Sequence, residues 1–133
     1  MARAEARRVA VQLIYESMLG GVGGEETMLN LLGFLPSSDD AQYIESVVSG
    51  VFEKSMELDE EISKLLKNWT IERLTRVDLS ILRLGAFEIL YREDVPTAVA
   101  VNEAVELSHV FSTEESSGFI NGVLGNLARQ KGI

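Results

Sequence analysis

The chain has 133 residues, the length of one domain, and its 46 % hydrophobic and 25 % charged residues are ordinary for a globular protein. It has no cysteine and a single histidine, His109, which excludes a disulfide scaffold, a thiolate metal site and any site that needs two imidazoles. Its net charge of −9 argues against nonspecific nucleic-acid binding. No apolar run approaches the ~20 residues that cross a bilayer, so we expect one cytoplasmic domain over residues 1–133, with no membrane partner.

The charges are distributed unevenly along the chain. Residues 1–15 carry a net charge of +2 and residues 63–92 carry +3, whereas residues 16–62 carry −10 and residues 93–133 carry −4. A local basic surface can therefore exist on this acidic protein.

The first half of the chain shows helical periodicity with glycine-rich interruptions. Residues 20–24 indicate a flexible connection, residues 27–32 a short second helix, and residues 33–40 a loop whose aspartates can cap the next helix. A third helix from Ala41 and a fourth that extends to Trp69 are predicted from their apolar spacing. The residues expected to be buried in these helices are Ala6, Val9, Ala10, Leu13, Ile14, Ile44, Val47, Val48, Val51, Phe52, Leu58, Ile62, Leu65, Leu66 and Trp69.

The second half contains the most apolar helix. Residues 70–76 are predicted to form a tight turn or a short helix. Residues 78–92 form a helix that is apolar around most of its circumference, so we place it at the centre of the fold. Pro96 ends this helix and helps to start the next, and Ser112 with Glu115 fits a capping box for the last helix. The narrow polar stripe of the central helix comprises Asp78, Gly85, Glu88 and Arg92.

The last two helices complete the predicted core, giving an all-α fold of about seven helices. No stretch shows the alternation typical of a half-buried strand. The residues expected to be buried here are Val101, Ala104, Val105, Ser108, Phe111, Phe119, Ile120, Val123, Leu124, Leu127 and Ala128.

Three arginines in the first helix are candidates for an anion-binding surface. Arg3 and Arg7 lie one turn apart, and Arg8 follows Arg7. Cations near a helix N-terminus oppose the macrodipole by ~0.3–1 kcal/mol each, which favours an anionic partner such as an RNA phosphate. The alternative is a solvated helix face on which Glu5 pairs with Arg8.

The segment that begins at Phe119 also allows two interpretations. Asn121 and Gly122 each cost about 0.7–1 kcal/mol relative to alanine inside a helix. In one interpretation Phe119 is core, Gly122 permits close helix packing and Asn121 caps a backbone group. In the other, the segment forms a polar and aromatic edge that contacts unpaired bases.

The central helix and the first helix offer a candidate partner surface. Gly85 lies on the polar stripe and indicates either close packing or access by a partner. Glu88 and Tyr15 are candidates for that surface, and the alternative for Glu88 is an i,i+4 pair with Arg92. The sequence shows no catalytic arrangement, metal-ligand spacing or nucleotide-binding loop, so we expect no enzyme activity and no cofactor.

Several stretches of the chain resemble the NusB family of transcription antitermination factors. They are the start around Arg7 and residues 10–15 (AVQLIY), residues 69–90 (WTIERLTRVDLSILRLGAFEIL), residues 94–107 (DVPTAVAVNEAVEL) and residues 119–124 (FINGVL). The resemblance implies two packed helical subdomains and binding of boxA-type single-stranded RNA in ribosomal RNA leaders. It also implies a heterodimer with the ribosomal protein NusE inside an RNA polymerase antitermination complex that supports ribosomal RNA synthesis.

The same resemblance implies roles for particular residues. RNA contact maps to Arg3, Arg7, Arg8, Gln12, Gly118, Phe119 and Asn121. Partner contact maps to Tyr15, Glu88 and Arg92. Positive charge is reduced here, because Ala4, Glu5 and Ala6 interrupt the arginine cluster and Gly118 stands where many relatives have lysine, so we expect NusE to complete a weak RNA site. The alternative, which the charge of −9 favours, is a helical protein–protein interaction module or a homodimer that hides the first-helix arginines and does not bind RNA.

Overall fold

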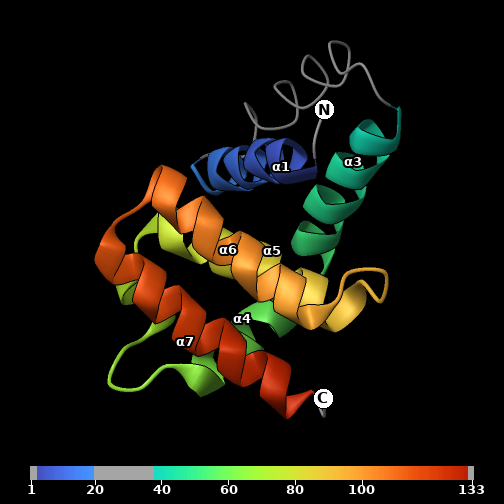
Figure 1. Ribbon diagram of the computed structural model, residues 1–133. Helices are drawn as coiled ribbons and strands as arrows, with labels where there is room; N and C mark the ends of the chain where they lie inside the picture. Colours follow the sequence, from blue (N-terminus) through green and yellow to red (C-terminus); the bar gives the residue numbers. More distant parts are fainter. Residues whose placement is uncertain (1–2, 20–37, 132–133) are drawn as a thin grey trace.

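The computed structural model describes residues 3–19 and 38–131, and the regular structure in those ranges is helical (Figure 1). Its elements are α1 (Arg3–Met18), α3 (Ser38–Glu53), α4 (Ser55–Leu65), the 3-10 helix η1 (Ile71–Arg73), α5 (Arg76–Tyr91), α6 (Thr97–Phe111) and α7 (Glu114–Gln130). The predicted all-α fold is confirmed. The predicted connection over 20–24 and short helix over 27–32 lie outside the described residues, and the predicted loop over 33–40 gives way to α3 at Ser38.

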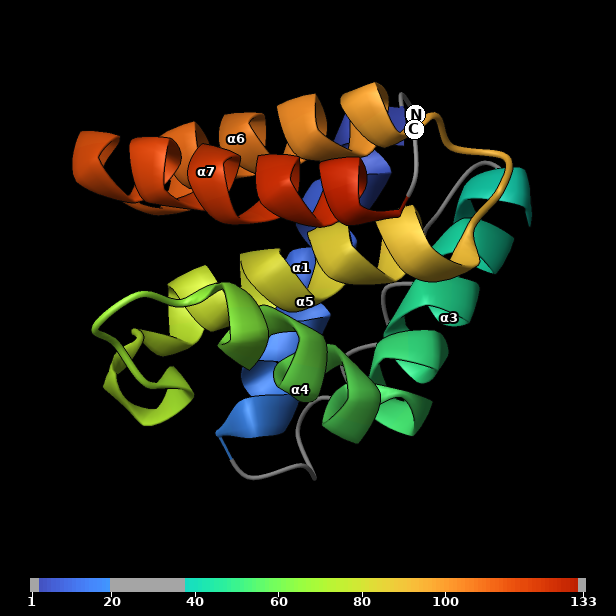
Figure 2. The same ribbon diagram turned by 90° about the horizontal axis from the view of Figure 1, so that it is seen from below.

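Helix α5 lies at the centre and contacts each of the other described α-helices. Its residues are buried on nearly all sides, including the polar Asp78, Ser80 and Glu88. In Figure 2, α6 and α7 lie side by side in one layer, and α5 lies between that layer and α4. Helices α1 and α3 pack on each other as a second group (Figure 1). The predicted central position of this helix is confirmed.

Two aromatic residues predicted to be buried lie on the surface instead. Phe52 is 55 % exposed and Trp69 is 51 % exposed. Phe52 lies one position, about 100°, beyond the buried Val51 and falls at the edge of the apolar stripe of α3. Trp69 follows the end of α4 at Leu65, so the helical spacing that predicted its burial no longer applies there.

Side-chain caps fix where α5 and α7 begin. The hydroxyl oxygen of Thr75 accepts a hydrogen bond from the backbone N–H of Asp78 at 3.1 Å. Thr113, rather than the predicted Ser112, caps α7 by accepting from the backbone N–H of Ser116 at 3.1 Å. The predicted capping box was therefore wrong by one position, because the hydroxyl of Ser112 donates to Asp78 on α5 instead. The predicted role of Pro96 in starting α6 is confirmed, since it is the N-cap of that helix. Its predicted role in ending the central helix is not, because α5 already ends at Tyr91.

Candidate nucleic-acid and partner interface

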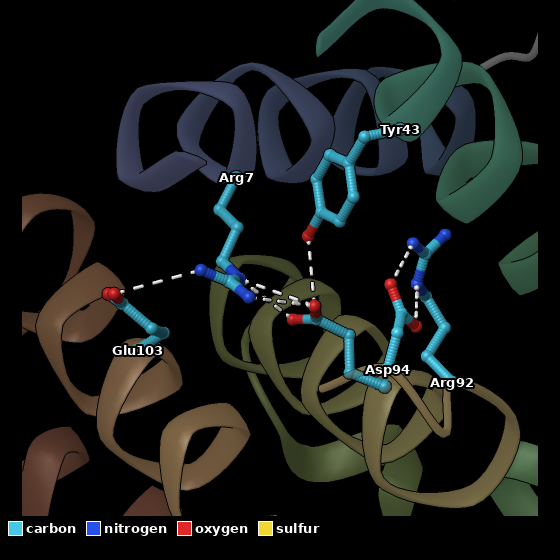
Figure 3. A network of polar contacts seen from close by, with 6 residues as sticks. Arg7, Tyr43, Arg92, Asp94 and Glu103 are labelled. Atoms are coloured by element: carbon cyan, nitrogen blue, oxygen red, sulfur yellow. Dashed lines mark hydrogen bonds and ion pairs between the residues drawn. The ribbon is translucent and has the colours of Figure 1, made fainter. Parts of the chain in front are cut away.

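Arg7 points into the protein and is only 4 % exposed. Its Nε lies 3.0 Å from Glu88 Oε1, its Nη2 lies 3.1 Å from Glu88 Oε2, and its Nη1 lies 3.7 Å from Glu103 Oε1 on α6 (Figure 3). Burial acts to lower the pKa of Arg7, but the hydrogen bonds and negative charge of Glu88 outweigh it and raise that pKa. The expectation that Arg7 is presented to RNA is wrong, because its guanidinium neutralises a buried carboxylate.

Glu88 is also buried, with 1 % of its surface exposed, so its predicted place on a partner surface is wrong. Besides binding Arg7, it accepts a hydrogen bond from the Tyr43 hydroxyl at 3.1 Å. Burial, followed by the negative charge of Glu88, raises the pKa of Tyr43. Glu88 therefore faces α1 and α3, not an external partner.

Arg92 forms its ion pair with Asp94 instead of the predicted Glu88. The distance from Arg92 Nη2 to Asp94 Oδ2 is 2.8 Å, and this hydrogen bond holds the pKa of Asp94 below its usual value (Figure 3). Arg92 follows the end of α5, about 22 Å along the helix axis from Val77 at 1.5 Å per residue. Because Tyr15 shares a cavity with Val77, Tyr15 and Arg92 do not form one surface.

Arg7 lies between the other two arginines of α1, because it shares the Tyr43 ring with Arg3 and a cleft with Arg8. The guanidinium carbon of Arg3 lies 4.2 Å from the ring centroid of Tyr43 on α3. Arg8 is exposed on the α6 side, where it lines a cleft of about 100 Å³ with Arg7 and with Glu103, Glu106 and Leu107 of α6. Among the described residues no ion pair joins Glu5 to Arg8, so that alternative is not supported either.

Gln12 and Tyr15 line the same cavity, of about 310 Å³. Its other walls are Val11, the α5 residues Val77 and Ser80, and Phe111 at the end of α6. Arg8 and Gln12 are one turn apart on α1, and Leu107 and Phe111 are one turn apart on α6. The Arg8 cleft and this cavity therefore follow one another along α1 and α6, and we call the two hollows together the α1–α6 groove.

The three predicted RNA-binding residues of α7 lie near a second cavity. Gly118 and Asn121 are exposed, and the half-buried Phe119 lines a cavity of about 350 Å³ together with Asp78 and Ser116. A Cβ atom on Gly122 would meet nothing within 4 Å, so Gly122 is not needed for close helix packing.

Close packing explains Gly85 of the central helix. A Cβ atom on Gly85 would lie 2.5 Å from Leu124 Cδ1 on α7. Of the two interpretations, close packing holds and partner access does not, since Gly85 is buried.

Asp78 lines the Phe119 cavity and was not predicted as a site residue. Its carboxylate accepts hydrogen bonds from Ser112 Oγ and Ser116 Oγ, each at 2.7 Å, which fastens the α6–α7 turn to the first turn of α5. Asp78 lines the Phe119 cavity, and the adjacent Val77 lines the α1–α6 groove. The only sequence signal for Asp78 was its place on the polar stripe, and nothing in the sequence pointed to Val77 or Phe111 as cavity residues.

A model of the NusB family matches residues 4–129. The chain belongs to the NusB family. Among curated NusB relatives, that of Clostridium botulinum strain Hall is 41 % identical over 142 residues, covering 96 % of this chain and 99 % of the relative. That of Acetivibrio thermocellus is 42 % identical over 132 residues, covering 98 % of this chain and 91 % of the relative. Both relatives are named transcription antitermination protein NusB.

Solved NusB structures share the arrangement of helices described above. NusB from T. maritima superposes with a TM-score of 0.85 at 26 % identity, over 98 % of this chain and 92 % of that one. A structure of the antitermination factors NusB and NusE in complex with dsRNA matches with a TM-score of 0.85 at 25 % identity, over 98 % of this chain and 99 % of that one. The two helical groups of Figure 1 are therefore the NusB fold.

Within the described ranges, no helix of this NusB-family chain is both long enough and apolar enough to cross a membrane. Across the same residues, no group of three or more histidine and acidic side chains is placed to hold a metal ion.

Proposed function

We propose that this chain is an RNA-binding antitermination factor that, together with NusE, binds boxA-type single-stranded RNA of ribosomal RNA leader transcripts. It acts in the cytoplasm as a non-enzymatic adaptor without a cofactor, within the RNA polymerase antitermination complex that supports ribosomal RNA synthesis. One domain over residues 1–133 carries this role. Family membership supports the proposal, as does a NusB relative solved with NusE and RNA.

The observation that carries the proposal is the α1–α6 groove, where Arg8, Gln12 and Tyr15 follow one another along α1. The exposed guanidinium of Arg8 neutralises one phosphate, and the exposed amide of Gln12 donates and accepts hydrogen bonds at a base edge. Arg3 supplies a second cation on the α3 side of the helix. The RNA strand also contacts the start of α7, at Gly118, Phe119 and Asn121.

The wall formed by Tyr15, Val77 and Phe111 is the surface for NusE. Tyrosine is enriched in protein interfaces because its ring buries apolar area while its hydroxyl keeps a polar partner. The RNA residue Gln12 and the partner residue Tyr15 share one cavity, so the two ligands meet there and form a composite site. Two weak contacts joined in this way gain ~10²–10⁴ in apparent affinity.

The test is a titration of labelled boxA RNA by fluorescence anisotropy, with and without NusE, over a range of salt concentrations. Arg8→Ala should weaken binding and lower the salt slope by about one ion, because one phosphate contact is lost. Arg129→Ala is the matched control, since it removes an exposed arginine at the far end of α7. Equal affinities and salt slopes for the wild type and Arg8→Ala would contradict the proposal. Arg7 is unsuitable for this test because its loss disturbs the fold.

The alternative is a homodimer or protein-interaction module that hides the arginines of α1 and does not bind RNA. Arg7 is already covered by Glu88 and Glu103 of the same chain, so a second copy is not needed to hide it. Measuring the mass in solution with and without boxA RNA separates the two functions. RNA increases the mass of an RNA-binding protein and leaves that of the alternative unchanged.

A further inference from the structure

Trp69 is the only tryptophan of the chain, and half of its surface is exposed. The guanidinium carbon of Arg73 lies 5.0 Å from its ring centroid. Both side chains line the cavity of about 350 Å³ that Phe119 also lines, with Leu74, Glu115 and Ser116 among the other walls. Two aromatic side chains from separate elements thus border a hollow at the lower end of the size range of small-ligand sites.

The segment of the chain that contains Trp69 and Arg73 has more basic than acidic residues. The segment 63–92 carries a net charge of +3, but three of its cations are neutralised locally: Lys64 by Glu61, Arg83 by Asp59, and Arg92 by Asp94. The other three, Lys67, Arg73 and Arg76, are exposed and have no carboxylate within ion-pair distance in the described part of the chain. All three lie within seven positions of Trp69 in the sequence, and one of them, Arg73, lines the cavity itself.

The interior of the cavity has a different character. The Asp78 carboxylate, with both oxygens already bonded to serine hydroxyls, and the Glu115 side chain line it beside the aromatic and leucine side chains. A phosphate would be repelled from these carboxylates. A neutral planar group would instead stack on the aromatic walls while its attached phosphates stay outside, on the side of Arg73.

We propose that this cavity is a nucleobase-binding site that takes one unpaired base of a single-stranded RNA between Trp69 and Phe119. The inference rests on the proposed RNA-binding function and extends the RNA path across the start of α5 to the segment between α4 and α5. Aromatic stacking of unpaired bases beside a cationic track is a common means of holding single-stranded RNA. Arg73 contributes by stacking on Trp69 and by neutralising a flanking phosphate.

Trp69 provides a direct readout, because the intrinsic tryptophan fluorescence of the chain comes from this residue alone. Titrating the full chain with single-stranded boxA RNA, with NusE present, should quench that fluorescence in parallel with the anisotropy of labelled RNA. Trp69→Leu should weaken RNA binding roughly 5-fold to 100-fold, the range of one lost base stack. Trp69→Phe should restore most of the affinity, and Arg73→Ala should weaken binding and lower the salt slope. Phe52→Leu, at an exposed aromatic residue on α3, is the matched control and should bind as the wild type does.

The outcomes separate this proposal from the proposed function. If RNA binds with an affinity that depends on Arg8, while Trp69 is not quenched and Trp69→Leu binds normally, the base site is overturned and the RNA-binding function stands. If boxA RNA does not bind at all, both the nucleobase site and the proposed RNA-binding function are contradicted. If NusE alone quenches Trp69 and Trp69→Leu weakens NusE binding but not RNA binding, the cavity is a protein-docking site and the base site is overturned.

Discussion

Arg7 on α1 and Glu88 on α5, 81 positions apart in the chain, form a buried ion pair with two parallel hydrogen bonds. Tyr43 on α3 and Glu103 on α6 complete the network, so four helices meet at one pair of charges (Figure 3). In this geometry two N–H groups of the guanidinium donate to the two oxygens of the carboxylate, and each group neutralises the charge of the other where water is excluded. The orientation of α1, and hence of the exposed Arg8 and Gln12, depends on this contact.

Removing one member of the pair should destabilise the protein strongly. Glu88→Gln keeps the side-chain volume but removes the buried counterion of Arg7 and leaves only Glu103, at 3.7 Å. We expect a loss of about 3–5 kcal/mol in the free energy of unfolding. Urea denaturation followed by circular dichroism measures the loss. Asp94→Ala, which breaks the exposed pair with Arg92, should cost about 0–1 kcal/mol and is the control. Losses of equal size would show that the buried pair does not hold the helices together.

Stability should fall in alkaline solution because of Tyr43. Its pKa in the folded protein is raised above the ordinary value of 10.0, so its contribution to stability is fully present below pH 10 and is lost as the pH rises toward the raised pKa. Over that interval the unfolded chain releases the proton and the folded chain keeps it. The free energy of unfolding should decline by up to about 1.4 kcal/mol per pH unit. Denaturation at successive pH values should show this decline in the wild type and a smaller one in Tyr43→Phe, and identical slopes would contradict the assignment.

Two glycines should respond to alanine in opposite directions. A Cβ atom on Gly50 would lie 2.2 Å from Cζ of the buried Phe87, so Gly50→Ala forces the ring to move and should cost about 1–3 kcal/mol. Gly122 is exposed on α7 with open space around it, so Gly122→Ala should gain up to about 1 kcal/mol from helix propensity. Thermal melts of the two variants should shift in opposite directions. A rise in Tm for Gly50→Ala would mean that Phe87 moves without cost.

Removing the N-cap of α7 at Thr113 should lower the stability of the protein, whereas substitution of Glu115 should not. Thr113→Ala removes the hydroxyl that accepts from the Ser116 backbone N–H, which typically costs about 1 kcal/mol of stability. Thr113→Ser keeps an acceptor and should recover most of the loss. Glu115→Ala should change the free energy of unfolding little, because the predicted capping box does not form. A larger loss for Glu115→Ala than for Thr113→Ala would reverse this assignment.

The fold could be predicted because helical spacing carries the information directly. The central place of α5 followed from a helix apolar on most of its circumference, and Pro96 correctly indicated the start of α6. Spacing failed at Trp69, where the chain leaves α4 before the aromatic residue is reached. It failed at Ser112, whose hydroxyl is bound by Asp78, a residue 34 positions earlier.

The candidate site was harder to predict, because a charged residue looks the same in a sequence whether it meets water or a buried counterion. Arg7 and Glu88 each lie on a polar stripe of their own helix, and only the packing of α1 on α5 shows that the stripes face each other. The positions of Gln12 and Tyr15 could be predicted from helical spacing alone, since both lie on the outward side of one helix. The hollow in which they meet requires Phe111 and Val77, which come from elements far away in the sequence.

The first turn of α5, which Ser112 and Ser116 fasten through Asp78, borders both cavities: Asp78 lines the Phe119 cavity, and the adjacent Val77 lines the cavity of Gln12 and Tyr15. A ligand that displaces this turn from one cavity also moves a wall of the other, so we expect the two occupancies to be energetically linked. Such a linkage is reciprocal: whatever factor the first occupant adds to the affinity of the second, the second adds to the affinity of the first.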